Sequence, residues 1–412
     1  MIDVEFETPA EVDKLANFTI AKILGTKEKI RYLAFLFENP KIWAALKRKV
    51  EEGVNVTIIA PPITSYSGDG FDKVYRIYSE AATFAEKKEN FDFYVCPLWW
   101  QKDPEIRYSR SLLRIAYALH IKLLVIDRAI YLPSSNFESA RHYDICLWLD
   151  SDEYVNECEQ FIDDLKSYCI NIVDTDFSTK VNMIKEAILM TLRSEVKEQK
   201  MYPFSKLLFL APFYRYQPNN LVRLKINDLL ESSDKYIYIM FQHFMPDVSN
   251  WSEPKSPCIM ETLISKWREG VDVRLLAAGG VVNPKAVRAE SAPILKPLYE
   301  SKRIKRSQKV HAKFICTDRG FLVGSMNMNP TSLFHSYFPS KRKIRISDTL
   351  HILLDDAIPE EYVAKKYGII WELPGYKSNV EVLLINEWNA ENQHLQGKLR
   401  DFFNRCWLGI KA

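Results

Sequence analysis

Short apolar runs and amphipathic segments follow one another in the same order in both halves of this chain. In the first half, the apolar run at residues 30–37 predicts a buried strand, and the amphipathic residues 41–52 predict a helix. Gly53 would end this helix, because glycine readily adopts the left-handed conformation that follows a helix C-terminus. Residues 54–59 are again apolar and predict a second strand.

The second half repeats this order. Residues 236–241 predict a strand, residues 259–269 a helix that ends at Gly270, and residues 271–276 the next strand. Around the two glycines, the sequence Glu-Gly-Val-Asn-Val of the first half matches Glu-Gly-Val-Asp-Val of the second. We therefore infer an internal repeat.

Further predicted elements extend the parallel. Strands are predicted at residues 123–126, 130–133, 144–149, 314–316, 321–324, 348–353 and 380–385, and charged or terminal helices at 153–166, 179–200 and 395–406. The pattern predicts an α/β protein of two similar halves. We expect a first lobe over residues 1–170, a helical linker over 171–205, a second lobe over 206–358, and a strand and helix over 359–412 that complete the second lobe.

Composition narrows the class of protein. With 412 residues the chain can bury a large core, and its 47% apolar and 26% charged residues are ordinary for a globular protein. No apolar run has the roughly 18–20 residues that a membrane span needs, and the acidic N-terminus is unlike a secretory signal. The seven scattered cysteines lack zinc-site spacing and indicate reduced thiols, so we expect a cytoplasmic protein without a structural metal.

Two groups of polar residues recur at identical offsets, 191 residues apart. The first group is His120, Lys122, Asp127, Ser134 and Asn136, and the second is His311, Lys313, Asp318, Ser325 and Asn327. In an extended segment, residues i and i+2 share a face, so each histidine points the same way as the lysine that follows it. If the halves pack about a pseudo-two-fold axis, one pocket holds two imidazoles, two ammonium groups and two amides.

Such a pocket is complementary to a phosphodiester, whose transition state spreads negative charge over equatorial oxygens. One histidine can attack phosphorus and the other can protonate the leaving oxygen, and neither role requires a metal or another cofactor. A carboxylate on the other ring nitrogen would fix the tautomer of each histidine. Asp144 and Asp348, which open the strands after the two motifs, are our candidates for this role. Asp127 and Asp318 begin tight turns, so a structural role for them is about as plausible as a catalytic one.

These motifs resemble the paired HKD signatures of the phospholipase D superfamily. The resemblance covers most of residues 30–353, with Pro133 in place of the usual glycine and with aspartates in place of the usual glutamate. It implies two α/β/α sandwich lobes that form a pseudo-two-fold monomer, with one site at the interface between the lobes. It also implies a phosphohistidine on His120 and general-acid catalysis by His311. Lys122, Lys313, Asn136 and Asn327 would bind phosphate oxygens, together with Ser134 and Ser325 beside them.

Basic residues gather near the motifs although the net charge is only +3. They include Lys302, Arg303, Lys305, Arg306, Lys309, Lys341, Arg342, Lys343 and Arg345. Before the first motif, aromatic and basic residues alternate, namely Trp99, Trp100, Arg107, Tyr108, Arg110, Arg114 and Tyr117. Such mixtures suit binding of a polyanion with stacked bases, although solvated surface and core packing explain part of the same pattern.

Three hypotheses follow. The leading one is a metal-independent nuclease that cleaves DNA or RNA, which makes nucleic acid the expected partner and excludes integral membrane association. The second is a phospholipase or phosphatidyl-transferase, because the same chemistry recognises a phosphodiester whatever groups it carries. The third is a nucleic-acid-binding or scaffolding subunit with silent chemistry, which the two intact His-Lys pairs disfavour.

Overall fold

A computed structural model describes most of the chain. The described residues are 1–63, 69–97, 99–102, 114–137, 141–177, 179, 182–183, 186–187, 190, 198–218, 220–246, 258–280, 292–329, 342–345, 370–373 and 375–410. The predicted strand at 348–353, most of the predicted helix at 179–200, and part of the aromatic and basic segment before His120 lie outside them.

The first lobe is built on an eight-stranded sheet with the order β1-β9-β8-β7-β2-β3-β4-β10. Its strands are β1 (Ile2–Glu7), β2 (Lys29–Leu33), β3 (Asn55–Ala60), β4 (Phe91–Val95), β7 (Leu123–Ile126), β8 (Ala129–Pro133), β9 (Asp144–Asp150) and β10 (Ile170–Asn171). Strands β2, β3 and β4 run parallel, and β7, β8 and β9 return antiparallel.

The second lobe is built on a nine-stranded sheet with the order β16-β15-β14-β17-β18-β21-β6-β5, in which β12 also pairs with β21. Its strands are β5 (Trp99–Lys102), β6 (Arg114–Leu119), β12 (Leu207–Leu210), β14 (Tyr236–Phe244), β15 (Asp272–Gly280), β16 (Ile304–Arg306), β17 (Phe314–Thr317), β18 (Gly320–Gly324) and β21 (Gly375–Glu387). Two small ribbons accompany the sheets: β11 (Lys200–Met201) with β13 (Tyr214–Arg215), and β19 (Arg342–Arg345) with β20 (Ile370–Leu373).

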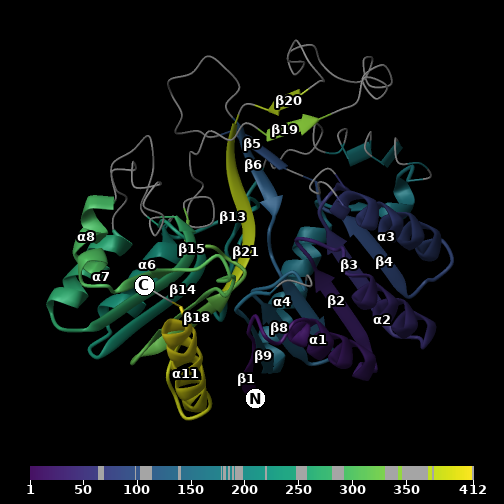
Figure 1. Cartoon of the computed structure of the whole chain (residues 1–412). Helices are drawn as coiled ribbons and strands as arrows, with labels where there is room; N and C mark the ends of the chain where they lie inside the picture. The colour runs from purple at the N-terminus through teal and green to yellow at the C-terminus, as the bar shows by residue number, and fades with distance from the viewer. Residues whose placement is uncertain are drawn as a thin grey trace.

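The same five-stranded unit occurs in both sheets. The order β3-β2-β7-β8-β9 in the first corresponds to β15-β14-β17-β18-β21 in the second, with the same parallel and antiparallel pairings. The predicted fold class, an α/β protein of two similar lobes, is confirmed, and Figure 1 shows the lobes on either side of the long strand β21. The domain boundaries stay a prediction, and β5 and β6, which lie within the expected first lobe, pair into the second sheet.

Helices cover the outer faces of both sheets (Figure 1). They are α1 (Lys14–Gly25), α2 (Pro40–Glu51) and α3 (Asp69–Ala85) in the first lobe, and α6 (Leu221–Glu231), α7 (Ile259–Arg268) and α8 (Ala292–Glu300) in the second. Asn39 caps α2 by accepting from the backbone of Lys41 and Ile42, and Pro40 follows at the first helical position. Gly53 and Gly270 adopt φ values of 90° and 96° after α2 and α7, as predicted from the sequence.

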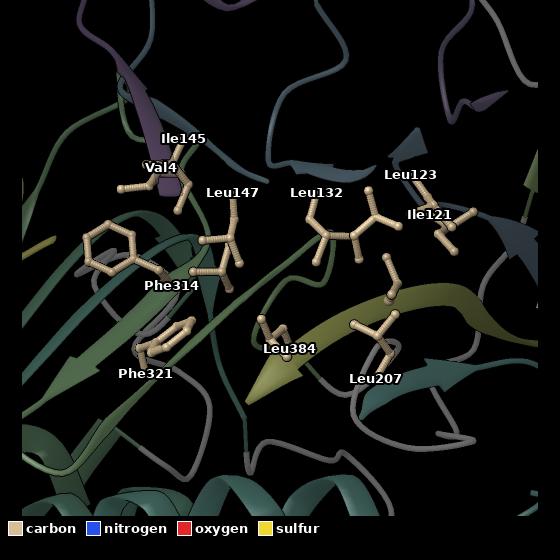
Figure 2. Close-up of a cluster of buried hydrophobic side chains, with 14 of the residues drawn as sticks. Val4, Ile121, Leu123, Leu132, Ile145, Leu147, Leu207, Phe314, Phe321 and Leu384 are labelled. Atoms are coloured by element: carbon tan, nitrogen blue, oxygen red, sulfur yellow. The ribbon is translucent and has the colours of Figure 1, made fainter. Parts of the chain in front are cut away.

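A shared hydrophobic core joins the inner faces of the two sheets. It combines residues of the first lobe, such as Leu132 and Leu147, with residues of the second, such as Phe314 and Leu384 (Figure 2). Helices α4 (Asp152–Lys166) and α11 (Gln393–Gly409) also contribute to this core, where Phe402 of α11 stacks on Phe6 of β1 at 4.4 Å. Because this core is continuous, it fixes how the two lobes lie relative to each other.

Candidate active site at the interface between the lobes

In each lobe, the residue just before the acid accepts a backbone hydrogen bond from the histidine segment of the opposite motif. The backbone N–H groups of His311 and Ala312 donate to the carbonyl of Tyr143, over 3.1 and 2.7 Å. The N–H of His120 likewise donates to the carbonyl of Val380, over 3.1 Å, where β6 runs parallel to β21. The two connections therefore cross between the lobes, and each acid that follows lies beside the histidine of the opposite motif.

A carboxylate oxygen lies close to Nδ1 of both histidine rings. Nδ1 of His120 lies 2.7 Å from Oε1 of Glu381, and Nδ1 of His311 lies 2.9 Å from Oδ1 of Asp144. Glu381 and Asp144 are almost fully buried, whereas the histidine side chains retain some exposure. With Nδ1 directed to a carboxylate, Nε2 is the nitrogen of each ring that remains for substrate chemistry.

The serines of the two motifs hold these carboxylates. Ser134 Oγ donates to Asp144 Oδ1 and Ser325 Oγ donates to Glu381 Oε2, each over 2.6 Å. Each hydroxyl also accepts the backbone N–H of the residue after the acid, Ile145 or Val382. In this structure both serines orient the acids, which the sequence did not indicate. A contact between these hydroxyls and phosphate stays a prediction.

The two motif lysines, Lys122 and Lys313, each donate a hydrogen bond to the backbone carbonyl of the histidine in their own motif. Lys313 Nζ donates to the carbonyl of His311 at 2.8 Å and to that of Ser134, in the other lobe, at 3.1 Å. Lys122 Nζ donates to the carbonyl of His120 at 3.2 Å and lies over the Phe35 ring, 4.9 Å from its centroid. Both lysines are nearly fully buried. Two cations are thus fixed beside the rings, as recognition of an anion requires.

Burial keeps both imidazoles neutral. Desolvation lowers the pKa of His120 to about 4, and the attraction of Glu381 is partly offset by Lys122 and Lys313. Desolvation also lowers the pKa of His311, against the attraction of Asp144 and together with Lys313 and Lys122. Each histidine is influenced by the lysines of both motifs, which places the four groups in a single site.

The carboxylates remain ionised in spite of their burial. Burial alone would raise the pKa of Glu381, but His120, Lys122 and the Ser325 hydroxyl lower it below its usual value. The pKa of Asp144 is lowered in the same way, since its interactions with His311, Lys313 and Ser134 outweigh desolvation. A neutral imidazole that donates from Nδ1 to an ionised carboxylate has a basic, unprotonated Nε2.

The motif aspartates lie away from this site. Asp127 accepts hydrogen bonds from the backbone N–H groups of residues 27–29, and Asp318 accepts them from residues 234–236. They follow β7 and β17, so each is at the opposite end of its strand from the histidine. Of the two roles that the sequence left open, the structural one accounts for these contacts, because each aspartate anchors the turn that leads into β2 or β14.

The remaining predicted site residues are the two asparagines, Asn136 and Asn327, and the acid Asp348. Asn327 is buried and its Oδ1 accepts from the backbone N–H of His243 over 3.3 Å, while Asn136 is half-buried after β8. A phosphate contact for either asparagine stays a prediction. Asp348 lies outside the described residues. At both motif histidines, His120 and His311, Nδ1 is already next to another acid, Glu381 or Asp144.

Three residues of the site were missed from the sequence: Glu381, Phe35 and His142. Glu381 is the second residue of the predicted strand at 380–385 and Asp144 is the first of that at 144–149, but Glu381 follows its serine by 56 residues where Asp144 follows its own by 10. Phe35 packs on His120 with ring centroids 4.5 Å apart. His142 stacks on His311 at 5.4 Å with ring planes 16° apart.

Two residues of the predicted basic cluster before the second motif form polar contacts within the second lobe. Arg303 pairs with Asp272, and Lys305 Nζ donates to the carbonyls of Trp407 and Ile410 near the C-terminal end of α11. These two cations therefore stabilise the second lobe. The side chains of Lys341, Arg342, Lys343 and Arg345 lie outside the described part of the chain.

Comparison with known proteins supports the same superfamily. The profile of the family described as "Cardiolipin synthase, PLD-like domain" matches residues 19–166 and 226–337, more than half of the chain. No curated protein sequence matches significantly. No helix among the described residues is long and apolar enough to cross a membrane.

Solved structures with a similar fold have low sequence identity. Phosphatidylserine synthase from Haemophilus influenzae is 13% identical with a TM-score of 0.57, over 99% of this chain and 89% of that one. Polyphosphate kinase from Porphyromonas gingivalis is 11% identical with a TM-score of 0.48 over 98% of this chain, which spans half of the kinase's length. Nuc from Salmonella typhimurium, a phospholipase D family member, is 14% identical with a TM-score of 0.31, over 42% of this chain and 97% of that one.

Proposed function

Because this chain belongs to the phospholipase D-like family, whose members act on phosphodiesters, we propose that it is a nuclease that works through a phosphohistidine without a metal cofactor. The observation that carries the chemistry is the crossed pair of contacts, His120 with Glu381 and His311 with Asp144. Each contact directs Nδ1 to a carboxylate and leaves Nε2 for the substrate. Two such rings beside two buried ammonium groups suit in-line substitution at phosphorus.

In the first step, Nε2 of His120 attacks phosphorus and forms a P–N bond. The P–O bond to the leaving nucleoside breaks, and the leaving oxygen takes a proton from Nε2 of His311. His120 suits the nucleophilic role, because its pKa of about 4 keeps the ring unprotonated near neutral pH. His311 must carry a second proton, and a bound phosphate anion favours this protonation by offsetting the field of Lys122 and Lys313.

In the second step, Nε2 of His311 takes a proton from water, and the water oxygen attacks the phosphohistidine. The P–N bond breaks and His120 returns to its neutral form. Asp144 stabilises the His311 imidazolium that forms, and Glu381 stabilises the positive charge that His120 carries while it is bonded to phosphorus.

Nucleic acid is the proposed substrate because basic positions line the strands that lead away from the site. Strand β6 runs from Arg114 towards His120 in register with β21, where Gly375 pairs with Arg114. Lys102 pairs with Arg114 on the next strand, and Arg342 pairs with Leu373, two residues before β21 begins. Figure 1 shows β5, β6, β19 and β20 near the same end of β21.

These positions lie at a distance that suits an extended polyanion. Residues 375–380 of β21 span roughly 20 Å between that end and Glu381. A chain of several phosphates can reach from the histidines to these positions, whereas a single head group cannot. The basic and aromatic composition of the strands fits contacts with a nucleic-acid backbone and its bases.

The test is an assay of labelled DNA and RNA, single- and double-stranded, in excess EDTA. We expect cleavage that weakens as salt is raised, since cation release accompanies phosphate binding. Quenching in alkali should trap a labelled phosphoenzyme, which the His120→Asn variant should lack. Undiminished cleavage by both His120→Asn and His311→Asn proteins would refute the assignment of the site.

A phosphatidyl-transferase is the second candidate, favoured by the description of the matching family as cardiolipin synthase. The same two histidines would then transfer a phosphatidyl group to an alcohol in place of water. Mixed vesicles that contain phosphatidylglycerol, assayed for new diphosphatidyl product in EDTA, distinguish the candidates. Product from vesicles without any cleavage of nucleic acid would favour the transferase.

A further inference from the structure

The half of the site around His311 contains a third group that can bind a metal. The ring of His142 stacks on that of His311, and Asp144 lies beside both. Within the described part of the chain, His142, Asp144 and His311 are a group whose ligand atoms all lie within 4.8 Å of one another. Asp144 is buried and the two histidines are partly exposed, so an ion can reach the group from solvent.

Backbone contacts fix this group in place. His142 and Asp144 flank Tyr143, whose carbonyl accepts from the backbone N–H groups of His311 and Ala312. Two ligands therefore come from the first lobe and one from the second, and both segments are tied at a single carbonyl. Binding of an ion would cost little rearrangement of the backbone, because the ligands are already positioned.

We propose that His142, Asp144 and His311 bind a divalent transition-metal ion of the Zn²⁺ type, and that this ion inhibits the enzyme. Two imidazoles and a carboxylate are ligands that Zn²⁺ accepts in four-coordinate sites, with the fourth position left for water or a phosphate oxygen. Mg²⁺ and Ca²⁺ prefer sets of oxygen ligands and fit this group poorly.

The inhibition follows from which atoms the ion occupies. His311 Nδ1 and Asp144 Oδ1 are 2.9 Å apart, close to the roughly 3.3 Å between neighbouring ligands of a tetrahedral zinc ion. The ion takes the place of the proton on His311 Nδ1, and the neutral ring then carries its proton on Nε2. Nε2 has no lone pair left to take a proton from water, so His311 can no longer act as the base in the second step proposed above. This arm of the inference rests on the proposed function, whereas binding of the ion does not.

Among the described residues, the other half of the site has no third ligand of this kind. His120 and Glu381 correspond to His311 and Asp144, but the ring that packs on His120 is that of Phe35. Two residues before the acid, Asn379 stands where the first lobe has His142. The His142→Asn substitution therefore gives the His311 half the same residue as its counterpart.

The binding test measures Zn²⁺ by equilibrium dialysis, and Co²⁺ by its visible absorption. We expect the intact protein to bind Zn²⁺ at micromolar concentration and to give the intense cobalt bands of a tetrahedral site. The His142→Asn substitution should weaken binding by at least about tenfold, the smallest loss typical of groups that support a metal site. His394→Asn, a change at a more exposed histidine near Asp3, is the control and should leave binding unchanged.

Equal Zn²⁺ affinity in the intact protein and a folded His142→Asn variant would overturn the proposal, and so would a cobalt complex without tetrahedral bands. Circular dichroism verifies folding, and the cobalt spectrum of the intact protein decides the matter if the variant does not fold.

The inhibition test compares cleavage in EDTA with cleavage in added Zn²⁺. The intact protein should lose activity with Zn²⁺ and regain it with EDTA. Relative to its own rate in EDTA, the His142→Asn protein should be inhibited only at Zn²⁺ concentrations at least about tenfold higher. If no substrate is cleaved even in EDTA, the proposed function fails, while the dialysis result still decides whether the ion binds.

Discussion

The half-sites around His120 and His311 contain the same kinds of residues, but a different side chain packs against each imidazole ring. Each has a buried acid at Nδ1, a serine that holds the acid and a buried lysine from the same motif. The His120 ring packs on Phe35, an apolar neighbour, whereas the His311 ring packs on His142, a polar one. The apolar wall favours the neutral nucleophile that we propose for His120, and the polar wall suits the proton exchange that we propose for His311.

The largest effect is expected from replacing either histidine. His120→Asn and His311→Asn should each lower kcat on nucleic acid by about a thousandfold or more. A phosphodiester with a nitrophenolate leaving group should separate the two, because that group departs without a proton. His311→Asn should release nitrophenolate in a burst and accumulate phosphoenzyme, and His120→Asn should do neither. Bursts of equal size in both variants would contradict the division of roles.

The next largest effect concerns the two carboxylates. Glu381→Gln and Asp144→Asn should each lower kcat by about 10²–10⁴-fold, since an amide no longer selects the required tautomer. With the nitrophenyl substrate, the burst rate of Asp144→Asn should recover most of its loss, because His311 is then not needed in the first step. The burst of Glu381→Gln should stay slow. Rapid-mixing kinetics provide the measurement, and recovery in both variants would show that the acids are equivalent.

The pH dependence should differ from that of an ordinary histidine. Because the pKa of His120 is about 4, kcat/KM should fall with acid only near pH 4, well below the usual histidine pKa of 6.5. Lys122→Met removes a positive charge that lowers this pKa, so the acidic limb of the normalised profile should move to higher pH. A limb that stays in place would show that the lysine does not tune His120.

Stability should depend on pH through the same group. The folded pKa of His120 lies below its unfolded value, so the unfolded chain binds the proton more readily. This contribution to stability is present above about pH 6.5 and is lost as the pH falls towards 4. Urea titrations of the intact protein and of His120→Asn should diverge in that window.

A smaller effect is expected from the serines. Ser134→Ala and Ser325→Ala each remove a hydrogen bond to an ionised carboxylate and should lower the free energy of unfolding by about 1.5–3 kcal/mol. Activity should fall by about tenfold, because the carboxylates keep their histidine partners. Denaturant unfolding and steady-state rates measure the two losses. Full activity in both variants would show that the serines do not position the acids.

The smallest effect on activity is expected at Asp127 and Asp318. Asp127→Asn and Asp318→Asn weaken the contacts with backbone N–H groups that anchor a turn in each lobe. They should lower the melting temperature while leaving kcat within a few-fold of the intact protein at low temperature, because they do not touch the histidines. A loss in kcat as large as that of the histidine variants would restore the catalytic alternative.

Much of the fold could be predicted from the sequence because the chain repeats itself. The elements around Gly53 and Gly270 form as their apolar patterns and helix-ending glycines indicate. The pairing of β5 and β6 with the second sheet could not be predicted, because it depends on contacts far apart along the chain. The proximity of each histidine to an acid of the other motif is also a property of tertiary packing.

Glu381 was missed for a different reason. An acid lies 10 residues after Ser134, so the repeat predicts its counterpart soon after Ser325, where Asp348 begins an apolar stretch. The second lobe has a much longer connection at this point, and the matching strand begins only at Gly375. Glu381 lies next to the start of its apolar stretch, as Asp144 lies at the start of its own, and an alignment by strand pattern would have found it. The residue before the motif serine also differs between the lobes: it is Pro133 in the first and Gly324 in the second. The second lobe requires glycine here, because a Cβ at Gly324 would collide with the Val382 carbonyl of β21.

The separation of His120 from Glu381 along the chain has a consequence for synthesis. Translation proceeds from the N-terminus, so both His-Lys pairs emerge before the acid that orients the first ring. A fragment that stops short of β21, through early termination or proteolysis, would carry the complete family signature and yet be chemically inert. Under the proposed function, a cell that makes this protein would thus be spared cleavage by unfinished copies.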